Sequence, residues 1–512
     1  MVSLGNMERW AISHRVILIL LSIILIGSLL RIYHLGTESI WLDEAASIDG
    51  SKESLVSVIE SSGRLHNVPP LYFVLLHFWM LLFGTGEVAV RSLSAIFGIM
   101  SIFVIYQVGC QLFNRKVGLI SSFLSAISCY HIHYSQEARA YSLLQLLTLL
   151  SFSFFIKIVK TDNKRGLYFA LLLLTNVCLA YTHPYGFFVI ISQIVYFLFL
   201  WSEYKRQRFW FLGVQVATVA FFSPWIPTFF GRVSKISVGF WIPKPSLKDI
   251  FETFIDYTSG TQGLSRLSMT FLLVFSILCL IGVIYIKRLN GGWTWRRLLQ
   301  SVKGLSWNVS PEFVEEILLL LTWLSFPIII PFIVSQFFTP IYLTKYTIGA
   351  LPAFYLLVAK GISAFTNRKA LFFVVILVSL LSLPGLQYYY SHYMKPQKAQ
   401  WREITGFIEH NTRARDVIII WPDYNQLPFN YCYKGNLERF GMPEMQDTKE
   451  IAGLVNGATV GKERVWLVLD SGRKASPKDS LMDRFGSGSV VREKKVFNAI
   501  EVYLFDLHVE SP

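Results

Sequence analysis

The chain has 512 residues, of which 53% are of hydrophobic types and only 16% are charged. Soluble domains carry nearer to a quarter charged residues, so this composition excludes an ordinary soluble domain and indicates a protein with many membrane spans. The formal net charge is +14, from 47 basic and 33 acidic residues. In a soluble protein this excess would suggest a nucleic-acid partner. In a membrane protein much of it belongs to cytoplasmic loops, so we expect no nucleic acid.

Apolar runs of the length that crosses a bilayer, about 20 residues, recur along the first 390 residues. The first run, Val16 to Leu30, follows Arg9 and Arg15 as a signal peptide would. No small-residue cleavage site follows it, so we interpret it as the first spanning helix. We expect about eleven spans, at 16–35, 88–113, 117–134, 142–157, 166–183, 185–202, 209–230, 267–286, 317–335, 346–362 and 370–388. The predicted fold class is therefore an all-α polytopic membrane protein.

Basic clusters fall in every second gap between the expected spans. They are Arg9 with Arg15, 114–116, 157–165, 205–208, 287–297, and Arg368 with Lys369. Lysine and arginine are enriched in cytoplasmic loops, so this alternation predicts a multi-pass protein of the cytoplasmic membrane with its N-terminus inside. Because the predicted number of spans is odd, the C-terminal part is expected outside.

The stretch at 71–84, LYFVLLHFWMLLFG, tests this count. It follows Pro69 and Pro70 and has only about 14 apolar residues, which is short for a span. A span here would move every later basic cluster to the other side of the membrane. We therefore favour a helix lying at the outer interface and started by its prolines. A short, tilted span is the alternative.

The sequence changes character near residue 390, where charged and turn residues return. Trp401, Ile404 and Ile408 have helical spacing, 416–421 and 465–469 have the composition of strands, and a strand pair is expected to close the segment over 496–505. We predict two domains: 1–390, which carries the spans, and 391–512, a small extracytoplasmic α/β domain.

Candidate site residues gather in the gaps that we place on the outer side. Asp43 and Glu44 lie in SIWLDEAASI, and His66 precedes Tyr72 in LHNVPPLY. A single charge at a helix end is most often a solvated anchor, and tyrosine there is typical of the aromatic belt. What favours a functional site is that two acidic and two cationic motifs share one predicted face. The other members are Glu137, Arg139, Tyr141, Lys345 and Tyr346.

These residue types suit transfer from a lipid phosphate to a hydroxyl group. A carboxylate can act as a general base on a hydroxyl nucleophile, and a neighbouring carboxylate can hold it or help to bind a divalent cation. Arginine and lysine can bind a phosphate and stabilise it as it leaves. An apolar groove between helices would suit the lipid, and we expect the interfacial helix and the 231–266 loop to shape that groove.

At these residues the sequence resembles the polytopic GT-C glycosyltransferases. The resemblance is to the bacterial branch related to dolichyl-phosphate-mannose protein mannosyltransferases, which includes the enzymes that add aminoarabinose or galacturonic acid to lipopolysaccharide. Each motif alone is weak, but their order along nearly the whole chain is specific. The motifs are Ser39 to Ala45, Pro69 to Tyr72 with Phe83-Gly84, Glu87 with Arg91 and Ser94 to Gly98, Tyr134 to Tyr141, Thr344 to Tyr346 with Leu351 to Ala353, and the C-terminal domain from Trp401.

The resemblance implies an inverting glycosyltransferase. The donor would be a polyprenyl-phosphate sugar, and the acceptor a hydroxyl of a glycolipid, of lipopolysaccharide or of another cell-envelope glycan, on the outer face of the membrane. Asp43 would be the catalytic base, supported by Glu44. The residues expected to bind substrate are Glu137, Arg139, Tyr141, Lys345, Tyr346, His66 and Tyr72.

Two departures from the family pattern bear on the site. Lys345 stands where the family often has arginine, so its phosphate contact would be a point charge rather than a fork. Asn67-Val68 precedes the prolines where many members have histidine, which weakens a metal site near His66. We expect no obligatory cofactor, while a bound divalent cation stays an alternative.

Two other functions stay open. An oligosaccharide ligase or polymerase that uses a lipid-diphosphate donor would need the same charges. A lipid-linked-sugar flippase or transporter usually keeps ionisable residues at mid-membrane, and the expected spans contain almost none.

Overall fold

The structure is a computed structural model that describes residues 4–64, 68–161, 164–228, 231, 242–260, 265–284, 311–392, 399–443, 448–470, 481–482, 485 and 489–507. His66 and the basic cluster at 287–297 lie outside these residues. The chain divides into two compact units, each described by itself. The helical unit comprises Met1–Tyr33, Glu53–Gly84 and Ala89–Tyr389, and the mixed unit comprises His34–Lys52, Thr85–Val88 and Tyr390–Pro512.

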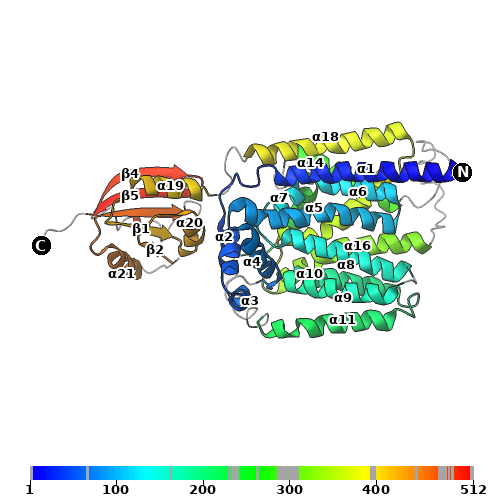
Figure 1. Cartoon of the computed structure of the whole chain (residues 1–512), viewed down its shortest axis with the longest axis horizontal. Coiled ribbons are helices and arrows are strands. Elements are labelled where there is room, and N and C mark those ends of the chain that lie inside the picture. The colour runs from blue at the N-terminus through cyan, green and yellow to red at the C-terminus, as the bar shows by residue number, and fades with distance from the viewer. Residues whose placement is uncertain are drawn as a thin grey trace. The chain divides into compact units, whose positions relative to one another are not determined.

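The helical unit contains long helices that run roughly parallel to one another (Figure 1). Its elements are α1 (Leu4–Ile32), α3 (Leu55–Arg64), α4 (Leu71–Phe83), α5 (Glu87–Leu112), α6 (Arg115–Ile127), α7 (Cys129–Ser135), α8 (Tyr141–Lys160), α9 (Arg165–Thr182), α10 (Tyr185–Phe199), α11 (Arg208–Phe222), η1 (Ser223–Trp225), α13 (Leu247–Ser259), α14 (Arg266–Ile284), α16 (Pro311–Phe337), η2 (Thr344–Ala350), α17 (Leu351–Ser363) and α18 (Arg368–His392). The first residues of α5 and the last of α18 belong to the mixed unit.

Within the described part of the chain, nine helices are long and apolar enough to cross a membrane. Each of the eleven expected spans nevertheless meets helical structure. Two differ from expectation: the 117–134 span is broken into α6 and α7, and the 185–202 span contains only the 15-residue α10. The 71–84 stretch forms α4, whose 13 residues are too few to cross a hydrocarbon core of about 30 Å without strong thinning. The predicted fold class, a polytopic helical membrane protein with a small C-terminal α/β part, is confirmed.

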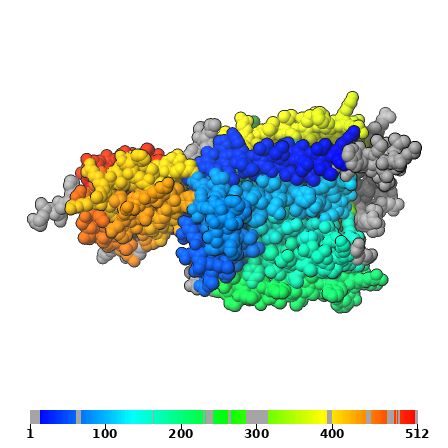
Figure 2. All heavy atoms as spheres, viewed as in Figure 1, coloured from blue at the N-terminus to red at the C-terminus, as the bar shows by residue number. Residues whose placement is uncertain are grey.

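Large apolar side chains cover the outside of the helical unit. On α1, Leu18, Leu21, Leu25 and Leu29 are each more than half exposed. In water such a surface would be a strong association site, but in a bilayer it faces lipid tails. Figure 2 shows α1 in dark blue, α18 in yellow and α11 in green forming bands on this face.

Arg31 explains the break between α6 and α7. Although it lies on α1 it is fully buried, and its guanidinium donates to the carbonyls of Ser125 (3.0 Å) and Ala126 (3.0 Å) in the last turn of α6. It also donates to Nδ1 of His131 on α7 (2.9 Å). The hydroxyl of Ser128 then caps the new helix by accepting from the His131 amide (3.1 Å). A buried cation thus satisfies helix-end carbonyls that would otherwise lack partners.

The mixed unit contains a five-stranded sheet with the order β2-β1-β3-β5-β4. Strand β1 is parallel to β2 and β3, whereas β5 is antiparallel to both β3 and β4. The elements of this unit are α2 (Leu42–Lys52), α19 (Trp401–Asn411), β1 (Asp416–Trp421), η3 (Asp423–Asn425), α20 (Gln426–Cys432), β2 (Arg439–Gly441), α21 (Thr448–Thr459), β3 (Arg464–Asp470), β4 (Ser489–Phe497) and β5 (Ile500–Leu507).

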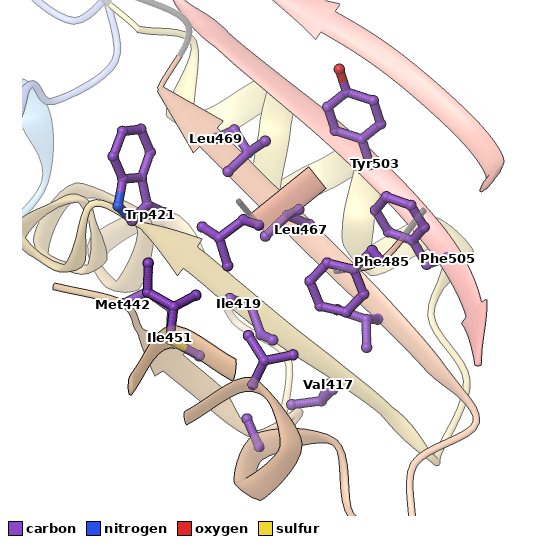
Figure 3. Packing of buried hydrophobic residues seen from close by; sticks show 14 residues of the cluster. Val417, Ile419, Trp421, Met442, Ile451, Leu467, Leu469, Phe485, Tyr503 and Phe505 are labelled. Carbon is purple, nitrogen blue, oxygen red and sulfur yellow. The ribbon is translucent and has the colours of Figure 1, made fainter. Parts of the chain in front are cut away.

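Both faces of this sheet are covered, which accounts for the uninterrupted apolar runs in β1 and β3. Alternate residues of a strand point to opposite faces. Val417, Ile419 and Trp421 therefore pack on one side with α21, as Figure 3 shows, while Ile418 and Ile420 pack on the other with α19 and α20. A sheet buried on both faces gives the unit its own hydrophobic core.

Candidate functional site

Two cations meet on one tyrosine ring in the helical unit. The Arg139 guanidinium lies 5.9 Å from the ring centroid of Tyr141, and the Lys345 ammonium lies 5.8 Å from the same centroid. Lys345 is also 5.7 Å from the ring of Tyr346, which lies 6.2 Å from that of Tyr141. The structure therefore brings together four of the predicted substrate-binding residues. With His183 they form what we call the cationic cluster.

Contacts with other helices hold both cationic segments in place. Arg139 follows α7 and is two residues before the start of α8, and its carbonyl accepts from the hydroxyl of Ser94 (3.1 Å). Ser94 in turn contacts the hydroxyl of Tyr72 (3.0 Å), which links Tyr72 to the backbone of the cluster. Lys345 lies on η2, whose Thr344 carbonyl accepts from the Tyr130 hydroxyl (2.6 Å).

His183 completes the cluster as a neutral ring. Its ring centroid lies 4.8 Å from that of Tyr346 and 6.4 Å from that of Tyr141. Its Nδ1 accepts a hydrogen bond from the Tyr185 amide (3.2 Å). Burial, and then the charges of Arg139 and Lys345, lower the pKa of His183 to about 3. The ring is therefore uncharged at any physiological pH and adds no third cation.

Glu137 lies one turn from the cluster and is almost fully buried. One of its carboxylate oxygens is 3.4 Å from Nε2 of His133. Its carbonyl accepts from the Arg139 amide (2.7 Å), so the two side chains are carried by one tight turn. The carboxylate contact with His133 joins this turn to helix α7.

The predicted catalytic pair lies in the mixed unit, on the first turn of α2. Glu44 is fully buried, and its carboxylate accepts from the Trp41 amide (3.4 Å) at the start of the helix. Such a contact is typical of a capping residue at the third helical position. Asp43 is only partly buried. The carboxylate of Glu44 is thus buried at the start of the helix, whereas the side chain of Asp43 is partly exposed.

Asp256 is a candidate that the sequence analysis missed. It lies partly buried on α13, one turn after Glu252. Burial, and then the charge of Glu252, raise the pKa of Asp256 from 3.8 to about 7. The aromatic and thiol groups within its electrostatic reach are Cys129, Tyr130, Tyr134, Tyr257 and Tyr342. The only signal in the sequence is an acidic pair at helical spacing, which more often marks a solvated face.

Replacing Asp256 by asparagine is expected to stabilise the protein at high pH only. Unfolded, this carboxyl ionises near pH 4, but folded it ionises near pH 7, so the free energy of unfolding falls as pH rises between these values. The whole shift corresponds to about 4 kcal/mol, and partial exposure reduces this to about 1–2 kcal/mol. Thermal unfolding of Asp256→Asn in detergent at pH 4.5 and pH 8 checks this.

The matched control is Asp49→Asn, which changes an exposed carboxylate on α2. It should alter the melting temperature equally at both pH values. An Asp256→Asn variant that behaves in the same way would show that the carboxyl of Asp256 ionises normally.

Among the described residues, no group of three or more histidine, cysteine, aspartate or glutamate side chains could hold a metal ion. His66, the residue nearest to the expected position of a metal ligand, lies outside those residues. Metal dependence therefore stays a prediction.

A family model and several solved structures match the chain. Residues 67–227, which include Tyr72, Glu137, Arg139 and Tyr141, match the model described as dolichyl-phosphate-mannose-protein mannosyltransferase. A search of the curated proteins found no match.

The solved structures extend the likeness to nearly the whole chain. ArnT from Cupriavidus metallidurans in the apo state is 12% identical with a TM-score of 0.59, covering 96% of this chain and 98% of that one. The same protein bound to undecaprenyl phosphate is 13% identical with a TM-score of 0.57, covering 97% and 99%. The archaeal oligosaccharyltransferase AglB from Archaeoglobus fulgidus, in complex with an inhibitory peptide and a dolichol-phosphate, is 13% identical with a TM-score of 0.51, covering 98% and 75%. The predicted resemblance to the GT-C membrane glycosyltransferases is confirmed, by the fold along nearly the whole chain and by the family model over residues 67–227.

Proposed function

We propose that this chain is an inverting glycosyltransferase. It transfers a sugar from a polyprenyl-phosphate donor to a hydroxyl of a glycolipid or other cell-envelope glycan. The N-terminus lies in the cytoplasm, and the reaction occurs on the outer face of the cytoplasmic membrane. The span-bearing part, residues 1–390, carries out the transfer, and residues 391–512 form the extracytoplasmic domain.

The observation that carries this proposal is the pair of cations on Tyr141. Both positive charges lie within 5.9 Å of one ring centroid, so an anion beside Tyr141 would be attracted by both of them. A phosphate suits that role because it presents several acceptor oxygens, which Arg139 can engage with two donors and Lys345 with one charge. The neutral His183 beside them can donate a hydrogen bond without changing the charge.

The roles in the reaction follow from chemical type. Asp43 takes the proton from the acceptor hydroxyl as its oxygen attacks the anomeric carbon. The bond from that carbon to the phosphate oxygen breaks, and the lipid phosphate leaves with the bonding electrons. Arg139 and Lys345 stabilise the charge that develops on this phosphate. Attack from the side opposite to the leaving group inverts the anomeric centre.

The matched structures support the choice of a lipid-phosphate donor. ArnT was solved with undecaprenyl phosphate and AglB with a dolichol-phosphate, so proteins that share this fold bind polyprenyl monophosphates. The described spans contain amide and hydroxyl networks such as Ser151, Asn176 and Gln193. These three side chains do not titrate, so this network supplies no group that could carry a proton for a transporter.

The test is a transfer assay in membranes that contain the protein. A panel of radiolabelled polyprenyl-phosphate sugars is supplied, together with lipid-diphosphate oligosaccharides, and label is followed into lipid, polysaccharide and protein fractions. We expect label to move from one monophosphate donor into a lipid or glycan fraction, and not to move in membranes that lack the protein.

Other outcomes separate the rival functions. Transfer only from a diphosphate donor would replace this proposal by a ligase or polymerase. Movement of a donor across a sealed vesicle membrane without transfer would replace it by a flippase. Label in the protein fraction would overturn the glycan acceptor and leave the donor assignment intact.

A further inference from the structure

The first acidic segment belongs to the same compact unit as the C-terminal sheet. Residues 34–52 and 85–88 group with the C-terminal part of the chain and not with the helices that precede and follow them. Helix α2, which carries Asp43 and Glu44, packs against α20. The C-terminal domain is thus completed by segments from far earlier in the sequence, and Ser39 contacts residues more than 360 positions later.

Arg402 joins three parts of this unit. Its guanidinium donates to the carbonyl of Gly36 (3.3 Å) and forms an ion pair with the carboxylate of Glu87. Its backbone amide donates to the hydroxyl of Ser39 (3.2 Å), which in turn donates to Glu403 (3.4 Å). The N-terminal turn of α19 therefore holds the backbone just before α2 begins.

The far end of α2 is held in a similar way. The ammonium of Lys52, the last residue of the helix, lies 5.9 Å from the ring centroid of Tyr431 on α20. The hydroxyl of Tyr431 donates to the carbonyl of Thr85 (2.7 Å), next to the Glu87 segment. Both ends of the acidic helix thus contact the domain, with Glu87 and Thr85 as a shared point of attachment.

We propose that Arg402 is a positioning residue. Through it, the C-terminal domain fixes the position of the acidic segment 36–52. The role in catalysis rests on the proposed function, since it assumes that Asp43 takes part in transfer. The planar guanidinium is suited to this role because it can contact a carbonyl and a carboxylate at once, which a lysine ammonium does less well.

Loss of Arg402 should loosen the segment without unfolding the domain. The side chain is 46% exposed, and half-exposed ion pairs contribute little to global stability. The domain core depends instead on Trp401, Ile404 and Ile408, which face the sheet from the same helix. Arg402 therefore allows the order of the acidic segment to be changed separately from folding.

Hydrogen exchange on the full-length protein in lipid nanodiscs tests directly whether the C-terminal domain fixes this segment. In Arg402→Glu we expect exchange of the amides of 36–52 to rise about five- to tenfold, while exchange in β1, β3 and β5 is unchanged. The single variant Glu87→Arg should act alike, and the double variant Arg402→Glu with Glu87→Arg should recover most of the protection. The control Arg415→Glu breaks the exposed pair with Glu463 elsewhere in the domain and should leave 36–52 unaffected.

Transfer kinetics test the catalytic part. With the donor found in the panel, Arg402→Glu should lower kcat about tenfold with little change in the donor KM, and the double variant should restore it. If exchange of the 36–52 amides is unchanged in Arg402→Glu, or if the double variant does not recover protection, the C-terminal domain does not fix this segment through Arg402. If exchange rises but kcat does not fall, while Asp43→Asn abolishes transfer, the positioning role is wrong. If the wild type transfers no sugar, the proposed function fails. The exchange result then still shows whether the C-terminal domain fixes the 36–52 segment.

Discussion

Asp43→Asn is expected to lower sugar transfer by two or more orders of magnitude. A positioned general base typically contributes a factor of about 10²–10⁴ to the rate, which corresponds to about 3–5 kcal/mol of transition-state stabilisation. Asparagine keeps the size of the side chain and cannot accept the acceptor's proton. The backbone of Asp43 should keep its place, because its carbonyl still accepts from the hydroxyl of Ser47 (2.9 Å). Initial rates with the best donor of the panel provide the measurement.

Two further variants make the Asp43 result specific. Asp49→Asn removes an exposed carboxylate from the same helix and should transfer at the wild-type rate. Glu44→Gln keeps an acceptor for the Trp41 amide, so it should cost less than Asp43→Asn. Equal transfer by Asp43→Asn and the wild type would exclude Asp43 as the base and direct attention to Glu44 and Glu137.

The spans were predictable because a bilayer imposes one strong requirement. A segment that crosses lipid must satisfy its own backbone and present about 20 apolar residues, and both demands are visible locally. The break at Ser128 was not visible, since it depends on Arg31, whose buried guanidinium donates to carbonyls of α6 that lie 94 and 95 residues further along the chain. The sequence offers no local helix breaker such as proline at that point.

The candidate site was predictable in part for a similar reason. Arg139 and Lys345 are about 200 residues apart, yet the alternation of basic clusters placed both on one side of the membrane, and the structure brings both to Tyr141. Knowing which side of the membrane each loop lies on does not show which of its side chains contact each other. His183 is not among the predicted site residues, and its pKa depends on burial beside two cations that topology does not specify.

The grouping of residues 34–52 with the C-terminal domain also lay beyond the sequence. The predicted boundary at residue 390 follows a change in composition, which marks where one kind of segment ends. Composition carries no information about an earlier loop that docks on the domain. The contacts of Ser39 with Arg402 and Glu403 span more than 360 residues, and none of these residue types is unusual for a surface. Only the three-dimensional arrangement distinguishes them.

Arg139→Gln and Lys345→Gln are each expected to weaken donor binding about ten- to a hundredfold. A hydrogen bond between a charged group and a phosphate contributes about 1.5–3 kcal/mol, which gives this range. The Tyr141 ring links the two cations, so Tyr141→Ala should also weaken binding, whereas Tyr141→Phe keeps the ring and should change it by less than about threefold. Competition of transfer by undecaprenyl phosphate, measured in each variant, reports on the phosphate contact without the sugar.

Exchanging arginine and lysine distinguishes two kinds of phosphate contact, namely two parallel hydrogen bonds from a guanidinium and a single charge from an ammonium. Lys345→Arg should retain affinity, because a guanidinium still supplies the charge, while Arg139→Lys should lose part of it because an ammonium cannot donate two parallel hydrogen bonds. Lys369→Gln, an exposed cation of the same unit at the start of α18, should have no effect. If Arg139→Gln and Lys345→Gln lowered kcat and left inhibition by undecaprenyl phosphate unchanged, the cationic cluster would not be the phosphate site.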